Sequence, residues 1–377
     1  MHQAASDAEL GYQTVIPGST YVPDDAYVAD LRKAMPEMEE IRAWVKSLGL
    51  DYNLWPARPW PLTDDLHPTT WVARQARLVV AEAEAKRPLF LTASFYAPHP
   101  PLFPPARYFD SYMEQELPRP AHGDWVKWKD LTPKGTDNGH RVLLEGEALR
   151  RAQSGYFGLI QHLDHEIAPL IADFTKRSED AGRPWAVIVT ADHGEMLGEH
   201  EFHFNHHSLY DEALRVPLAI RAPGLRAGTR VVDAQVRVLD IPATVLDYLG
   251  LDPLKPCEGV DLLGYAEKVR HQSLLTTLYG RVTGALDRGT LLGVRSGRPE
   301  GDEGRPFKYI WDLDAAQEHL YDLDADPGEV RDIAAEQPGL VTQAHDLVGR
   351  EAKQATSRTA EVDPATRNAL RALGYME

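Results

Sequence analysis

Two histidine-bearing segments of this sequence carry residue types that bind metal ions and anions. The first runs from residue 191 to 218 and places Asp192 and His193 before Gly194, which frees the backbone to turn. An aspartate can give a hard divalent cation an anionic oxygen, and a neutral imidazole is a common metal ligand. Five histidines lie between residues 193 and 207, which favours metal or anion binding. Asp192 could instead cap a helix beside solvated histidines, and both alternatives stay open.

The second segment is SFYAPHPP, residues 94–101, in which His99 stands between two prolines. Pro98 and Pro100 restrict the backbone on both sides, so the ring of His99 is held with little conformational freedom. Such a histidine could contact a substrate oxyanion or protonate a leaving group. The alternative is a proline-rich crossing with an incidental surface histidine.

Both segments follow short apolar runs that predict buried strands. Residues 184–191 read PWAVIVTA, and residues 88–95 read PLFLTASF after a predicted helix, a position that favours a parallel strand. Residues 216–222, VPLAIRA, predict a third strand. Because ligands in open parallel sheets bind beyond the carboxyl ends of the strands, we expect Asp192 and His99 to lie close together.

The helical spacing of apolar residues predicts helices around these strands. They cover residues 24–47, 69–86, 145–176 and 239–249. From about residue 265 the pattern changes to short β-like runs at 273–279, 291–296, 306–311 and 318–323, followed by helices at 337–353 and 364–373. We therefore expect a catalytic α/β unit over residues 1–264 and a small antiparallel C-terminal unit over residues 265–377.

The composition argues against several classes of protein. The 377 residues carry a net charge of −17, whereas nucleic-acid binding needs a basic face. Cys257 is the only cysteine, so neither an internal disulfide nor a Cys-rich zinc module can form. We expect no membrane span and, in the sequence as given, no signal peptide, which leaves the compartment open.

Four motifs in this order resemble the metal-dependent sulfatases. They are SFYAPHPPLFPPARY, ADHGEMLGEH, HHSLYDEALRVPLAIRAPG and HLYDLDADPGEVRDIA, and the closing LRALGYME is similar to the family's last helix. The match spans about residues 88–377. A single such motif would be weak, but four in family order are specific.

The resemblance implies a fold, a reaction and a set of site residues. The fold would be an N-terminally truncated, alkaline-phosphatase-like α/β fold, a mixed sheet flanked by helices, with a small C-terminal antiparallel α+β subdomain. The reaction would be hydrolysis of a sulfate monoester on a small molecule or carbohydrate, with Ca²⁺ or another divalent metal and a formylglycine nucleophile. Asp192 and His193 would be metal residues, and His99 a catalytic residue that contacts the sulfate or the leaving group.

One departure from the family concerns a lysine that pairs with the sulfate. By spacing it falls at His206, or at His207 after a shift of one residue. We expect both histidines to contact the substrate and His206 to take part in catalysis. Activity would then fall as pH rises through the pKa of that histidine.

The second departure concerns the nucleophile. The family carries Cys- or Ser-x-Pro-x-Arg after an apolar strand that ends in Asp-Asp, and this sequence contains neither pattern. Cys257 has no proline two residues later. We therefore expect weak calcium binding and marginal stability, and activity is uncertain. A phosphate or phosphonate ester hydrolase of the same superfamily and a non-catalytic sulfatase-like protein remain alternatives.

Overall fold

The computed structural model describes most of the chain between residues 11 and 356. The described residues are 11–20, 22, 24–84, 87–126, 141–200, 202, 204–206, 208–223, 235–255, 259–263, 276–281, 290–296, 306–313 and 315–356. Cys257, His207 and the predicted helix at 364–373 lie outside them. None of the helices in this part of the chain combines the length and apolar character needed to cross a membrane.

Two short helices replace the single helix predicted over residues 24–47. Helix α1 (Ala26–Ala34) begins after Asp25, whose carboxylate accepts the Val28 N–H, and α2 (Ile41–Ser47) begins after Glu40. The single-helix prediction was wrong because Pro36 disfavours helical backbone in the residue before it, so α1 stops at Ala34.

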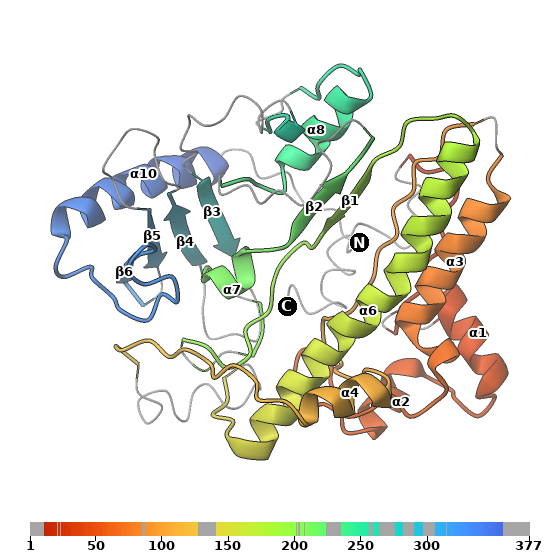
Figure 1. The fold of residues 1–377 in the computed structure, drawn as a ribbon. Coiled ribbons are helices and arrows are strands. Elements are labelled where there is room, and N and C mark those ends of the chain that lie inside the picture. The colour runs from red at the N-terminus through yellow and green to blue at the C-terminus, as the bar shows by residue number, and fades with distance from the viewer. Residues whose placement is uncertain are drawn as a thin grey trace.

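A layer of helices lies on one side of the molecule, with α6 as its longest member (Figure 1). It contains η1 (Asp64–Leu66), α3 (Pro68–Glu82), α4 (Ala106–Met113) and α6 (Gly146–Asp180). Helix α3 begins at a proline and is capped by the His67 ring, whose Nδ1 accepts the Thr69 N–H at 3.1 Å. The helices predicted at 69–86 and 145–176 are confirmed, with shifted ends.

Strands β1 (Val187–Thr190) and β2 (Leu218–Arg221) lie between α6 and α8 (Asp240–Tyr248) (Figure 1). They confirm that the runs at 184–191 and 216–222 form strands, and α8 confirms the helix at 239–249. The predicted burial of the first strand is wrong, because the side chains of β1 are half-buried or exposed. The two strands pair antiparallel, with Val187 opposite Arg221. These two strands are therefore antiparallel neighbours and not parallel ones.

Residues 88–95 depart from the prediction of a buried parallel strand. They belong to no ladder of the described strands, and their side chains alternate strictly between exposed and half-buried. Leu89 and Leu91 pack towards α3 and α6, while Phe90 is exposed. The apolar run therefore covers one face of the helix layer instead of lying inside a sheet.

The C-terminal part forms the antiparallel sheet that the sequence predicts. Strands β3 (Thr276–Arg281), β4 (Thr290–Arg295), β5 (Phe307–Asp312) and β6 (Gln317–Asp322) follow one another in the order β3-β4-β5-β6. Helix α10 (Pro338–Thr356) covers one face of this sheet and buries Val348 against Leu320. Each such buried aliphatic side chain stabilises the folded state by about 1.5–3 kcal/mol.

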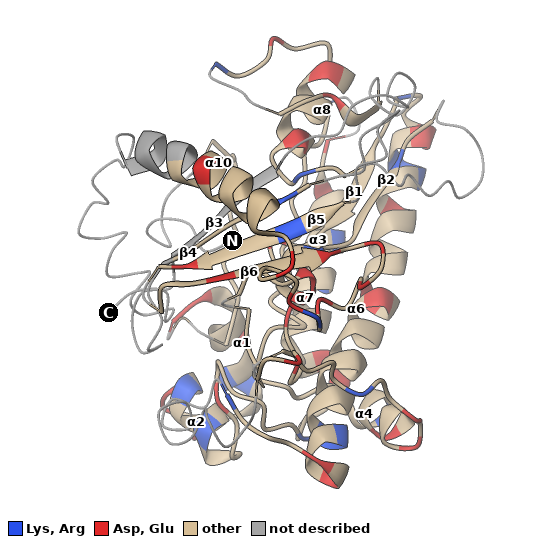
Figure 2. Cartoon of the chain, turned by 90° about the vertical axis from the view of Figure 1, so that its left-hand side faces the viewer, with Lys and Arg blue, Asp and Glu red and all other residues tan. Residues whose placement is uncertain are grey.

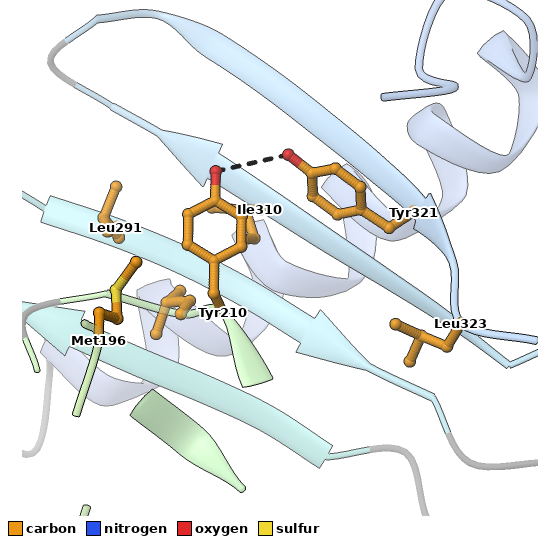
Figure 3. Close-up of a cluster of buried hydrophobic side chains, with 7 residues drawn as sticks. Met196, Tyr210, Leu291, Ile310, Tyr321 and Leu323 are labelled. Atoms are coloured by element: carbon orange, nitrogen blue, oxygen red, sulfur yellow. Dashed lines mark hydrogen bonds between the residues drawn. The ribbon is translucent and has the colours of Figure 1, made fainter. Parts of the chain in front are cut away.

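A buried apolar cluster joins this sheet to the loop after β1. Met196 and Tyr210 come from the loop region, and Leu291 and Tyr321 come from β4 and β6 (Figure 3). The Tyr210 and Tyr321 hydroxyls are 3.4 Å apart. The C-terminal sheet thus supports the segment that carries the clustered histidines.

Candidate functional site

The loop after β1 is held in shape by hydrogen bonds to α7 (Asp211–Leu214) and within itself. The Gly194 N–H donates to the Ala213 carbonyl at 2.7 Å, and Met196 N–H donates to Asn205 at 3.0 Å. A Cβ atom on Gly194 would lie 1.9 Å from the Glu212 carbonyl oxygen. A glycine is therefore required here for the loop to approach α7 this closely.

Three of the histidines singled out in the sequence gather beside this loop. The ring centroids of His193 and His206 lie 3.9 Å apart in a stacked arrangement. His99 arrives from the proline-rich segment, with its centroid 5.2 Å from that of His206 and 6.0 Å from that of His193. The crossing of residues 94–101 thus meets the loop after β1.

Two of the rings have their tautomer set by a backbone carbonyl. His99 Nδ1 lies 2.7 Å from the Pro100 oxygen, and His193 Nδ1 lies 2.8 Å from the Gly194 oxygen. A carbonyl oxygen can only accept, so each Nδ1 carries the proton when the ring is neutral. Each Nε2 then keeps a lone pair that can bind a metal ion or take up a proton.

A buried carboxylate, Glu195, lies under the imidazoles. Its side chain is 5% exposed, and its Oε2 lies 3.3 Å from His206 Nδ1. Burial raises the pKa of Glu195 to about 7, although the nearby rings of His99 and His193 oppose that shift. We call His99, His193, Glu195 and His206 the imidazole site.

Burial also controls the charge of His99. It lowers the pKa of that ring to about 4, and nearby His206 adds to the lowering while Glu195 opposes it. The ring is therefore neutral near pH 7 until an anion binds, because a negative charge nearby stabilises the imidazolium.

Asp192 lies at the edge of the imidazole site. Its side chain is 74% exposed, and its Oδ1 accepts the His193 N–H at 3.1 Å and lies 3.9 Å from His193 Nε2. A closer group of possible metal ligands does not include Asp192: the ligand atoms of His193, Glu195 and His206 lie within 4.8 Å of one another. We call these three residues the tight donor set. Sequence reasoning missed Glu195, although it directly follows the Asp-His-Gly motif.

These donors do not fit the calcium ion that the family resemblance implies. Calcium takes six to eight oxygen ligands, whereas the tight set offers two imidazoles and one carboxylate. Imidazole-rich sites with a carboxylate suit zinc, iron and similar first-row metals. The described residues are consistent with a divalent metal.

A second cluster of charged side chains connects the same loop region to the C-terminal sheet. Arg295 Nε and Nη2 each lie 3.0 Å from an Asp211 oxygen, and Lys308 Nζ contacts Asp211 and lies 2.8 Å from Glu329 Oε1. Glu329 Oε2 accepts the Asp211 N–H at 2.7 Å. His200 Nε2 lies 2.8 Å from Glu212, next to Asp211. We call Asp211, Glu212, Arg295, Lys308 and Glu329 the ion anchor.

Comparison with family models gives two matches. Residues 38–251 match the model described as "Sulfatase", and residues 198–349 match "N-sulphoglucosamine sulphohydrolase, C-terminal". The first match covers more than half of the 377 residues.

Two curated proteins illustrate the similarity in sequence. An arylsulfatase of Clostridium perfringens is 30% identical over 290 residues, which is 76% of this chain and 57% of that protein. A choline-sulfatase of Rhizobium meliloti is 27% identical over 365 residues, 91% of this chain and 65% of its own length. This chain therefore spans less than two thirds of either relative.

Solved structures confirm the fold expected from the resemblance. A phosphonate monoester hydrolase from Silicibacter pomeroyi superposes with a TM-score of 0.61 at 20% identity, over 85% of this chain and 69% of its own. The protein BT4656, solved with D-glucosamine-2-N,6-O-disulfate, gives a TM-score of 0.59 at 18% identity, over 79% and 71%. Both superpositions extend over most of this chain.

Proposed function

Because this chain belongs to the sulfatase family, we propose that it forms the part of a sulfate monoester hydrolase that binds the sulfate group and a divalent metal. One observation carries this proposal. Histidines from two segments about a hundred residues apart in the chain, His99 and the pair His193 and His206, converge over a buried carboxylate. Packing alone rarely gathers that many ionisable side chains, whereas functional sites do so regularly.

The proposed roles follow from the protonation of the rings. His99 Nε2 keeps a lone pair, so His99 can take up a proton when an anion binds and then donate it to a sulfate oxygen or to the leaving group. His206 stands where most relatives carry a lysine and would contact the sulfate as well. His207, which lies outside the described residues, stays a proposed substrate contact beside it.

The metal residues in this proposal are Asp192 and His193, as the family resemblance implies. Metal ions in such sites neutralise the anion and polarise the bond to the leaving group. No step of the proposal depends on calcium. No residue is proposed here as the nucleophile, because the sequence lacks the Cys- or Ser-x-Pro-x-Arg pattern from which formylglycine is made.

The proposed substrate class is a small-molecule or carbohydrate sulfate ester. The names of the relatives support it, since they include an arylsulfatase, a choline-sulfatase and a structure solved with a sulfated glucosamine. We further propose residues 1–264 as the catalytic unit and 265–377 as the C-terminal unit. The separate core under α10 supports this division.

The test is binding of 4-nitrophenyl sulfate to the whole chain by calorimetry, with release of 4-nitrophenol followed in parallel. We expect His99→Ala and His206→Ala each to weaken binding at least tenfold, since each removes a contact to the anion. His165→Ala, which removes an exposed histidine on α6, should bind like the parent chain.

Two results would count against the proposal. Equal affinity of the parent chain and both site variants would place the ester elsewhere. Tighter binding of 4-nitrophenyl phosphate than of the sulfate would support a phosphate ester hydrolase instead. Release of 4-nitrophenol would in addition show that a residue of this chain acts as a nucleophile, which the proposal does not include.

A further inference from the structure

The tight donor set includes His206, whose ring stacks on that of His193. By spacing, the lysine that the family resemblance implies falls at His206, or at His207 after a shift of one residue. A lysine offers a fixed positive charge, whereas a histidine offers a lone pair. We propose that His193, Glu195 and His206 form a binding site for a first-row transition-metal ion such as zinc or cobalt. This inference rests on the proposed function for the place of the site and changes two of its assignments: His206 would bind the metal ion instead of the sulfate, and Asp192 would lie beside the ion. Its test requires no turnover.

The distances allow one ion to reach all three side chains. Their ligand atoms lie within 4.8 Å of one another. Ligand atoms that lie about 2.1 Å from the same zinc ion are about 3.4 Å apart in the tetrahedral arrangement that zinc prefers. Closing the set therefore needs side-chain movements of roughly an ångström.

The surroundings of His193 favour metal binding. Its Nδ1–H donates to the Gly194 carbonyl, so Nε2 is presented as the ligand atom. Gly194 is itself held by its hydrogen bond to Ala213 on α7. A ligand with a fixed tautomer and a fixed backbone loses little entropy on binding, and metal-binding histidines usually have such a partner.

Glu195 and His206 supply the other two donors from a buried position. Their side chains are 5% and 8% exposed, and Glu195 Oε2 lies 3.3 Å from His206 Nδ1. A carboxylate shielded from water gains strongly from a nearby divalent cation, because its own hydration has been lost. Two imidazoles and one carboxylate are also the ligand set of the His₂Glu zinc hydrolases.

The choice of metal follows from the ligand types. Calcium binds oxygen and tolerates imidazole poorly, so the set should discriminate strongly against it. Imidazole favours zinc, copper, iron and nickel, with affinities that rise along the first row towards copper. Asp192 is exposed at the edge and lies outside the tight set, so its loss should matter less than the loss of His206.

The test is a titration of the metal-free whole chain with Co²⁺, followed by the visible absorption of the bound ion, with Zn²⁺ and Ca²⁺ as competitors. We expect one Co²⁺ site per chain that Zn²⁺ displaces and millimolar Ca²⁺ does not. His206→Lys, which replaces the imidazole by an ammonium group, and Glu195→Gln should each weaken Co²⁺ binding at least tenfold. Asp192→Asn should have a smaller effect, and His165→Ala should have none.

His206→Asn provides a second removal of the imidazole, and circular dichroism establishes that each variant is folded. The proposal is overturned if Ca²⁺ binds more tightly than Co²⁺, or if His206→Lys and His206→Asn keep the parental affinity. Binding of 4-nitrophenyl sulfate to the parent chain is measured both in EDTA and in the presence of Zn²⁺. A parent chain that binds the ester but not Co²⁺ would refute the metal proposal alone, and one that binds Co²⁺ but binds the ester under neither condition would refute the proposed function alone.

Discussion

The imidazole site and the ion anchor both involve the loop region after β1, but the pKa values of their buried carboxyl groups are shifted in opposite directions. In the ion anchor, Arg295 and Lys308 reach from β4 and β5 to the carboxylate of Asp211. Burial alone would raise the pKa of Asp211, yet these two cations lower it to about 2. In the imidazole site, burial raises the pKa of Glu195, and only imidazoles oppose it in the part of the chain that the structure describes.

This difference distinguishes a structural cluster from a binding site. Carboxylates that are already paired with lysine and arginine have little to gain from an added cation. The two groups also differ in position, because the ion anchor joins the loop to the C-terminal sheet while the imidazole site joins it to the proline-rich segment. Acidic and basic positions are otherwise interspersed along the helices (Figure 2).

The largest expected effect comes from breaking the ion anchor. Lys308→Met would leave Glu329 and Asp211 with one cation fewer, and the Lys308 and Glu329 side chains are only 2% and 1% exposed. We expect the free energy of unfolding to fall by about 3–5 kcal/mol, because an uncompensated charge would stay buried. Urea unfolding followed by circular dichroism measures it.

The matched control is Arg331→Met. It breaks the exposed pair between Arg331 and Glu336, whose side chains are 62% and 56% exposed. Because water screens both charges, breaking this pair should cost far less than breaking the ion anchor. Equal losses of stability in the two variants would show that the ion anchor has no special structural role.

The next largest expected effect is an increase in the free energy of unfolding when a metal ion binds to the imidazole site. Co²⁺ at a hundred times its dissociation constant should raise the free energy of unfolding by about 2.7 kcal/mol, because the ion binds only the folded chain. EDTA should reverse the gain, and His206→Lys should not show it. A gain of the same size in His206→Lys would mean that the ion acts elsewhere.

Acid should weaken the ion anchor by a smaller amount. The pKa of Asp211 is lower in the folded chain than its ordinary value of 3.8, so its contribution is complete above that value and is lost as pH falls towards about 2. The difference corresponds to roughly 2 kcal/mol between pH 5 and pH 2. Urea unfolding across this range should show that loss for the parent chain.

Asp211→Asn isolates this contribution, because it removes the titrating group at a similar size. Burial raises the pKa of Glu329, and the nearby charge of Asp211 adds to that rise, so Asp211→Asn also changes the contribution of Glu329. The difference in pH dependence between the parent chain and the variant should therefore report the loss of Asp211 together with this coupling to Glu329. Parallel curves for the two proteins would contradict the assignment.

The smallest expected effect is at the apolar cluster between loop and sheet. Tyr321→Phe removes a hydroxyl that lies 3.4 Å from the Tyr210 hydroxyl, a long hydrogen bond (Figure 3). We expect a loss of about 0.5–1 kcal/mol in urea unfolding. Tyr321→Ala, which also removes the buried ring, should cost several times more, and similar losses would show that the ring contributes little.

Motifs in the sequence located the site better than apolar patterns located its strands. His99 and His193 could be found because the flanking prolines and the Asp-His-Gly motif mark them locally, and His206 could be found through its spacing in the stretch that resembles the family. The C-terminal sheet could be predicted because short β-like runs follow one another there, separated by glycine-rich turns. Glu195 and Lys308 could not be found in this way, since what distinguishes them is burial beside residues from other elements.

Two fold predictions failed for physical reasons that the pattern alone did not reveal. Pro36 divides the first helix, although apolar spacing continues across it. Residues 88–95 look like a buried strand because they are apolar, but their alternating exposure shows that one face packs on helices. An apolar run indicates that a segment is covered by other parts of the molecule, but it does not indicate whether helices or strands cover it.

The apolar cluster of Figure 3 also affects the order of events during synthesis. Tyr210 meets Tyr321, a partner 111 residues further along the chain. Contacts at such separations form slowly, because the intervening chain must first be brought together. The loop after β1 therefore cannot acquire its final shape on the ribosome until β6 has emerged, so a nascent chain interrupted earlier would expose this loop without its apolar support.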